Sequence, residues 1–317
     1  MNKKVILILL STAIILSSIY IGADNQLLTE NYSLTLIGKL RFSRTIAAFL
    51  AGFAFSIAGA VTQSIFQTPL ASPYTLGIAG LAISAISIVT IFSTGVLFIS
   101  EDTTLLWIPF VGVISAMLGV FCMFFMKQRN LSKDSFVILG LSLSFFSSSI
   151  LMLVQYITDI SGVFRLTRWL LGNIRAVSFT ELFIQSVFTA ASFFIALKLS
   201  KQLDILKCGD QFANFKGVSI KKTWLASGTA IAFATGVTVS LFGPVPFIGI
   251  FEPILARKLF GEMTKDYILP AGLIGGIFLV MCDLIARTLL FPLEIPTGVV
   301  TSILGLPVVI YLVVRKS

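Results

Sequence analysis

The sequence predicts an all-α, polytopic membrane protein with about ten transmembrane helices in one domain, residues 1–317. The first observation behind this prediction is composition. Hydrophobic residues make up 56% of the chain and charged residues 12%, whereas a soluble domain carries about 25% charged residues. The second is the length of the apolar runs, because a helix needs about 20 residues to cross about 30 Å of hydrocarbon. These runs are continuous, whereas barrel strands alternate apolar and polar residues.

Ten apolar runs are expected to form helices, in chain order at 4–22, 44–66, 73–93, 104–126, 135–157, 181–199, 223–242, 248–260, 267–289 and 297–314. The first run follows Lys3 and Lys4 and is longer than the 7–15 residues of a signal-peptide core. A retained helix is therefore favoured over a cleaved signal. The second run begins after Arg44, and the next charged residue is Glu101.

Glycine and proline residues affect the prediction for two of the later helices. The eighth run is short for a spanning helix and follows Gly243, Pro244 and Pro246, which indicates a broken or tilted segment. In the ninth run, Gly272 and Gly276 form a GxxxG pattern, which lets helix backbones approach closely in lipid. The small residues of the other runs are interpreted in the same way, as sites of close packing.

Ten crossings place both termini on one side, and the basic residues indicate which side that is. With the N-terminus in the cytoplasm, sixteen of the 23 lysines and arginines fall in cytoplasmic segments and seven outside. This bias agrees with the positive-inside rule, so both termini are predicted to be cytoplasmic. The outer set is Lys39, Arg41, Arg44, Arg165, Arg168, Arg175 and Arg287.

Several classes of function are excluded or disfavoured by what the sequence lacks. There is no histidine, which excludes a histidine-ligated haem, and Cys122, Cys208 and Cys282 lack the spacing of a zinc site or a disulfide framework. No GxxxxGK[ST] pattern is present, so the chain is not expected to bind ATP through a P-loop. The net charge of +9 is attributed to cytoplasmic loops and not to nucleic-acid binding. No extramembrane segment is large enough for an enzyme domain.

Few ionisable residues fall within the predicted spans. They are Glu252, at the start of the eighth, and Asp283 and Arg287, whose i,i+4 spacing indicates a local ion pair. An ion-coupled secondary transporter would need a relay of such groups in mid-membrane, and a channel would need polar or charged rings along a pore. Neither pattern is present. A protein of this kind that moves a solute against a gradient must draw its energy from another subunit.

The segment Lys198–Trp224 has the pattern of two short amphipathic helices followed by a turn at Gly217. Apolar Leu203, Leu206, Phe212 and Phe215 alternate there with charged residues. One interpretation is an interfacial helix lying on lipid headgroups. The other is a docking surface for a soluble partner at the membrane.

Four stretches in order along the chain resemble the FecCD/BtuC-type permeases of bacterial iron-siderophore and vitamin B12 ABC importers. They are "RFSRTIAAFLAGFAFSIAGAVTQSIFQTPLASPYTLGI", "LDILKCGDQFANFKGVSI", "FGPVPFIGIFEPILAR" and "CDLIARTLLFPLEIPTGVVTSILGLPVVIYLVVRK". Together they run from residue 41 to near the C-terminus. The chain departs from the family pattern at Ser43, where proline is frequent, at Thr68, where asparagine is usual, and at Glu252 and Ile254, where an apolar residue and histidine are common.

The resemblance implies roles for three groups of residues. Acidic residues of an extracytoplasmic binding protein would dock on arginines, which also have a plainer reading as interfacial anchors. An ATPase would engage a coupling loop at about 199–222, and a neutral inner gate would close the pathway. The residues are Arg41, Arg44 and Arg287 for docking, Leu206, Gly209, Asp210, Phe212, Ala213 and Gly217 for coupling, and Thr68, Pro69 and Leu70 for the gate.

The resemblance also implies a function. The chain would be a non-catalytic permease subunit in the bacterial cytoplasmic (inner) membrane and would form half of a translocation pathway. A second permease, with a heterodimer favoured over a homodimer, two ATP-binding subunits and a siderophore-binding protein would complete the importer. ATP and Mg would bind the ATPase, with no cofactor and no metal site in this chain, and no nucleic-acid partner is expected. An iron(III)-siderophore is the expected substrate, with cobalamin or haem as alternatives.

Overall fold

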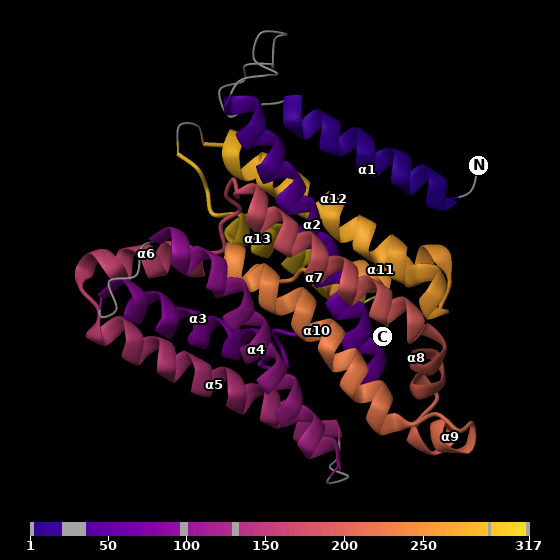
Figure 1. Ribbon diagram of the computed structural model, residues 1–317. Coiled ribbons are helices and arrows are strands. Elements are labelled where there is room, and N and C mark those ends of the chain that lie inside the picture. Colours follow the sequence, from indigo (N-terminus) through magenta and orange to yellow (C-terminus); the bar gives the residue numbers. More distant parts are fainter. Residues whose placement is uncertain (1–2, 21–35, 96–100, 129–132, 291–292, 315–317) are drawn as a thin grey trace.

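The computed structural model describes residues 3–20, 36–95, 101–128, 133–290 and 293–314, and this part of the chain forms thirteen helices (Figure 1). In chain order they are α1 (Lys3–Tyr20), α2 (Leu36–Phe66), α3 (Ile78–Gly95), α4 (Glu101–Gln128), α5 (Lys133–Ile157), α6 (Ile160–Leu170), α7 (Phe179–Lys198), α8 (Ser200–Lys207), α9 (Asp210–Phe215), α10 (Ile220–Phe242), α11 (Phe251–Phe260), α12 (Thr264–Thr288) and α13 (Thr297–Val314). Within the described residues, seven helices are long and apolar enough to cross a membrane, and α3 and α13 provide shorter apolar stretches.

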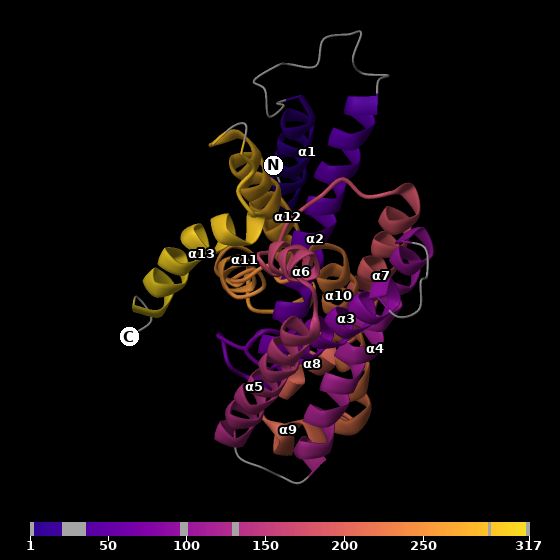
Figure 2. The ribbon, with the colours of Figure 1, turned by 90° about the vertical axis from the view of Figure 1, so that its left-hand side faces the viewer.

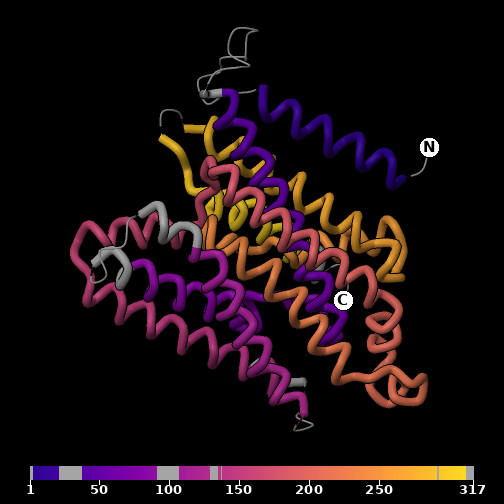
Figure 3. Tube along the Cα trace, in the orientation of Figure 1, coloured from indigo at the N-terminus to yellow at the C-terminus, as the bar shows by residue number. Residues whose placement is uncertain are grey.

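Helices α2 and α10 are the most buried of the long helices and run through the middle of the bundle (Figure 3). Small residues make this burial possible. Gly275 of α12 faces the backbone carbonyl of Gly52 of α2, so the two helices meet almost backbone to backbone. The predicted GxxxG pattern has the packing role expected of it, because Phe53 lies against Gly272 and Phe49 against Gly276.

Helices α1 and α5 are peripheral, with few of their residues buried inside the chain. Figure 2 shows α13 leading away from the rest of the bundle. Large apolar side chains are exposed on all three helices, including Leu16, Phe145 and Ile303. In a membrane protein such faces contact lipid or another apolar surface, because the hydrocarbon layer favours them.

The predicted broken segment is present. Residues 243–250 are not regular helix, and Gly243, Phe247 and Gly249 have positive φ. The carbonyl of Gly249 lies against Gly59 of α2, where an added methyl group would be 1.8 Å away from it. Helix α11 then begins at Phe251. This crossing is thus made of an irregular stretch with turns, followed by a helix of only 10 residues.

A buried carboxylate holds the backbone just before this short helix. Glu252 is fully buried, and its Oε2 accepts the backbone N–H of Gly249 at 2.8 Å. Gly249 lies before Ile250, the N-cap residue of α11, so the bond satisfies an N–H of the irregular stretch. Glu252 therefore connects the first turn of α11 to the broken segment that precedes it.

Three details of the predicted helices differ from the structure. Helix α2 begins eight residues earlier than the predicted 44, so both Arg41 and Arg44 lie within it. Helix α3 begins at Ile78 and not at 73, because residues 67–77 form a loop that ends at Gly77, with φ 72°. Helix α6 was not predicted, since it has 11 residues and two arginines, too short and too polar for a span.

The two ends of the bundle differ in the residues that gather there. At the loop end, α8 lies beside α12 and α9 lies beside α8, and Lys4 of α1 pairs with Asp266 of α12 at 3.1 Å. At the arginine end lie the start of α2 and the end of α12, with Arg44 and Arg287. Residues predicted to share a side of the membrane therefore meet at the same end.

Candidate functional site

The predicted pair of short amphipathic helices is present at the loop end as α8 and α9. Leu203, Leu206 and Ala213 are buried and fix the two helices to the bundle. Phe212 and Phe215 face outward, with Phe215 86% exposed. An exposed aromatic side chain that could have been polar at no structural cost marks a surface suited to contact.

Gly217 ends α9 in the conformation that the sequence predicted for it. Its φ is 74°, and its N–H donates to the carbonyl of Asn214 while that of Val218 donates to the carbonyl of Ala213. These two bonds form a Schellman motif, which satisfies the last carbonyls of a helix. An added methyl group at Gly217 would meet no atom within 4 Å, so the backbone conformation and not crowding selects glycine.

Asp204 clamps α8 to the start of α12, a role that sequence reasoning missed. Its carboxylate accepts the backbone N–H of Thr264 at 3.0 Å and the Thr264 hydroxyl at 2.6 Å. Lys207 donates to Asp204 at 2.9 Å and to the Thr264 hydroxyl at 3.0 Å. The aspartate lies within the "LDIL" of the coupling-loop stretch, but nothing local indicates its distant partner.

The predicted gate residues follow directly from the end of α2. Thr68 and Leu70 are exposed, and the carbonyl of Thr68 accepts the N–H of Ala71 at 3.1 Å to close a turn. Before this turn stands Gln67, whose φ is 53°. Its Nε2 donates to the carbonyl of Leu206 in α8 at 2.7 Å.

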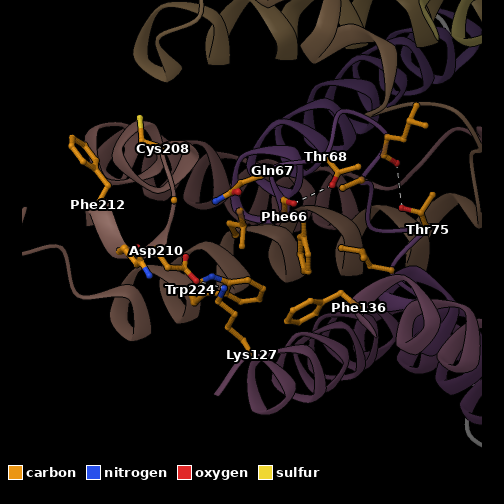
Figure 4. A pocket seen from close by; sticks show the side chains of 16 residues that line it. Phe66, Gln67, Thr68, Thr75, Lys127, Phe136, Cys208, Asp210, Phe212 and Trp224 are labelled. Atoms are coloured by element: carbon orange, nitrogen blue, oxygen red, sulfur yellow. Dashed lines mark hydrogen bonds and ion pairs between the residues drawn. The ribbon is translucent and has the colours of Figure 1, made fainter. Parts of the chain in front are cut away.

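A cavity of about 760 Å³ lies between the gate residues and α9 (Figure 4). It brings together predicted residues of both groups, with Thr68 and Leu70 on one side and Gly209, Asp210 and Phe212 on the other. Pro69, Leu206, Ala213 and Gly217 do not line it. The remaining wall includes three aromatic side chains, those of Phe66, Phe136 and Trp224.

An ion pair crosses the edge of this cavity. Lys127, in the last turn of α4, pairs with Asp210, the first residue of α9. Figure 4 shows both side chains beside Trp224, and the lysine lies 5.9 Å from the centre of that ring. Lys127 therefore links α9 to α4, and sequence spacing does not indicate this link.

At the arginine end, Arg44 is bound by two carboxylates. Its Nε donates to Asp283 at 3.1 Å, and its Nη1 donates to both oxygens of Glu294 at 3.1 and 3.2 Å. The side chain of Arg44 is 14% exposed and that of Asp283 1%, whereas that of Glu294 is 47% exposed. Arg44 therefore connects a buried acid to one at the surface.

Arg287 is more deeply placed, with 3% of its side chain exposed. Its Nε lies 3.6 Å from Asp283, which is the predicted i,i+4 ion pair. Its Nη2 donates to the backbone carbonyl of Ser18 in α1 at 3.0 Å. Arg44 and Arg287 thus share Asp283, while Arg41 lies one turn nearer the start of α2 and is partly exposed.

A bundle of long apolar helices with one broken crossing, a two-helix loop at one end and paired arginines at the other defines the class as a polytopic helical membrane protein. The sequence pattern of the FecCD transport family matches residues 4–315. The chain belongs to the FecCD transport family, and it is accordingly a membrane-embedded ABC importer permease without a catalytic role of its own.

Individual relatives agree with this assignment. The chain is 31% identical to the Fe(3+)-citrate import system permease protein YfmE of Bacillus subtilis, over 97% of this chain and 92% of the relative. It is 28% identical to the vitamin B12 import system permease protein BtuC of Vibrio vulnificus, over 99% and 95%. The fold is similar to that of a metal-chelate type ABC transporter in an inward-facing conformation, with a TM-score of 0.84, 23% identity and coverage of 98% and 97%.

Proposed function

We propose that this chain is the permease of an importer for an iron(III)-siderophore or a similar iron(III) chelate. The observation that carries this proposal is the 31% identity to an Fe(3+)-citrate permease across nearly the whole of both chains. Cobalamin is the alternative with a specific observation in its favour, because a vitamin B12 permease is 28% identical over 99% of the chain. Haem is a further alternative.

Uptake in cells with and without the gene tests the substrate. The panel contains radiolabelled iron as ferric citrate, ferric hydroxamates and ferric catecholates, together with labelled haem and cobalamin. Loss of uptake of one iron chelate, restored by the gene, would support the proposal and name the chelate. Loss of cobalamin uptake alone would replace it with the alternative, and loss of haem uptake alone would do the same for haem.

The proposal includes the partners of the chain. A second permease, with a heterodimer favoured, pairs with this one, and two ATP-binding subunits that carry ATP and Mg engage the loop end. Support for that engagement comes from the outward-facing Phe212 and Phe215 on a loop whose backbone is fixed by Gly209 and Gly217. An extracytoplasmic binding protein delivers the chelate at the arginine end.

The three arginines contribute differently to docking in this proposal. Arg41 and Arg44 are both partly exposed, and the Nη1 of Arg44 already donates to Glu294. Arg287 acts from behind by holding Asp283 in place for Arg44. Acidic residues of a binding protein would form charge-assisted hydrogen bonds with this surface.

Charge reversal at Arg41 tests the docking surface. Arg41→Glu should weaken binding of the binding protein to the assembled importer, with a loss that shrinks as salt is raised, because exposed charges are screened. Lys39→Glu makes the same change of charge half a turn away and serves as the control. Equal losses for both variants would reduce the effect to general electrostatics, and no loss for Arg41→Glu would remove the residue from docking. Charge reversal at Arg44 is a poor test, since it would place a third carboxylate beside Asp283 and Glu294.

A further inference from the structure

We propose that Gln67 is the positioning residue that connects the gate to the coupling loop, so that a displacement of α8 and α9 is passed to residues 68–71. This inference rests on the proposed engagement of an ATPase at the loop end. It adds a residue that lies outside both predicted groups. The observations that carry it are one hydrogen bond, one backbone conformation and the space around the gate.

The hydrogen bond joins the two elements directly. The Nε2 of Gln67 donates to the carbonyl of Leu206 at 2.7 Å, in the last turn of α8. The carbonyl of Leu206 also accepts the backbone N–H of Gly209 at 3.0 Å. The amide of Gln67 is thus a second donor to a carbonyl at the end of α8, where partial negative charge favours it. A side chain from the residue before the gate is therefore bonded directly to the end of α8.

The backbone conformation of Gln67 does not favour glutamine at this position, so the contact made by its side chain is the reason for it. With φ 53°, it occupies the left-handed region, which is unfavourable for a residue other than glycine. Glycine would adopt this conformation without that cost but has no amide to reach Leu206. Gln67 thus adopts an unfavourable backbone conformation at the position from which its side chain bonds to α8.

The elements on either side of this link are held firmly. Gln63, one turn earlier in α2, donates to the carbonyl of Ile250 at 2.9 Å. On the other side, Asp204 fixes α8 to the start of α12. The later part of the loop is anchored too, because the hydroxyl of Tyr74 accepts the N–H of Val245 at 2.9 Å.

Residues 68–70 lie between these anchors and border open space. Thr68 and Leu70 are exposed and face the cavity of about 760 Å³ that separates them from α9. A side chain that borders such a cavity moves with little loss of packing, since few atoms lie against it. Figure 4 shows Gln67 between Thr68 of the gate and Cys208 of the coupling loop. Gln67 is thus bonded to α8, while the gate residues that follow it border open space.

The test follows the gate without requiring the substrate. Thr68→Cys, in a chain that also carries Cys208→Ser, reports gate accessibility through its rate of alkylation by a maleimide in the assembled importer. The rate is measured with and without ATP and vanadate. We expect ATP to change the rate when Gln67 is present. In Gln67→Ala the ratio of the two rates should fall to about one, because a ratio of one means no coupling free energy, while ATP hydrolysis continues.

Two further variants separate the link from general effects. Gln67→Glu keeps the size of the side chain but removes the N–H donor, and it should lose the response as Gln67→Ala does. Gln211→Ala removes an exposed glutamine that lines the same cavity, and it should retain the full response. A normal response in Gln67→Glu would overturn the proposal. Failure of the unaltered importer to hydrolyse ATP would contradict the proposed function instead, so the two failures are distinguishable.

Discussion

At the arginine end, Arg287 is buried, Arg44 is largely so, and both share the buried carboxylate of Asp283, whereas at the loop end Lys127 and Asp210 pair at the partly exposed edge of a cavity. Burial decides what each pair contributes. A buried charge must be paired within the protein, because an isolated one is costly, while a pair in contact with water adds little to stability. The arginine end therefore depends on a buried cluster of charges, whereas the loop end is held by helix caps, hydrogen bonds and ion pairs that stay in contact with water.

The largest effect is expected from Asp283→Ala. The change leaves Arg287 without a carboxylate and Arg44 with only the exposed Glu294, and removing one partner of a buried pair costs about 3–5 kcal/mol. Thermal unfolding of the purified protein in one detergent measures it. Glu294→Gln is the control, with a change of about 1 kcal/mol or less, since Glu294 is half exposed and Asp283 remains. Comparable losses in the two variants would contradict the distinction between a buried and a surface acid.

The second largest effect is expected between the two ends, where α2 packs against residues 243–250. Gly59→Ala should destabilise the protein by about 3 kcal/mol, because the new methyl group meets the backbone carbonyl of Gly249 at 1.8 Å and a backbone cannot rotate away. The same unfolding measurement applies. Gly80→Ala is the matched control, as its methyl group would stay 3.2 Å or more from any neighbour, all of them atoms of Ser147 and Ser144. An equal cost at both glycines would show that the bundle relaxes at Gly59.

At the loop end, Gly217→Val should change function more than stability. Valine in the left-handed conformation is strained by about 1–3 kcal/mol, and the strain is confined to the end of α9. We expect ATP hydrolysis to continue while less substrate is transported per ATP in the reconstituted importer. Lys216→Val places the same side chain at φ −80°, where it is unstrained, and should transport normally. Normal transport per ATP in Gly217→Val would remove the turn from the mechanism.

The smallest effect is expected from Lys127→Ala. Its ion pair with Asp210 is partly exposed, so unfolding stability should fall by about 1 kcal/mol or less. Raising the salt concentration of the unaltered protein should reproduce most of this change by screening. A loss close to that of Asp283→Ala would mean that the loop end depends on its charges as much as the arginine end does.

The sequence predicted the ten crossings because each apolar run reports its own length, and it predicted the turn at Gly217 because the signal is local. The pairing of Arg44 with Asp283 joins residues 239 positions apart, and no spacing rule indicates it. The i,i+4 pair of Asp283 with Arg287 was visible, but it is the longer contact of the two. For the same reason, Asp204, Lys127 and Gln67 were missed, since each acts on a distant helix.

The broken crossing before α11 also bears on how the chain is made. Backbone that is not helical can lie within hydrocarbon only where protein covers it. Residues 243–250 receive that cover from Gly59 of α2 and, at Phe247, from Gly305 of α13, which is synthesised after them. During translation this stretch is therefore only partly covered until α13 has been made. Premature termination anywhere before α13 should leave a chain that membrane quality control recognises and degrades.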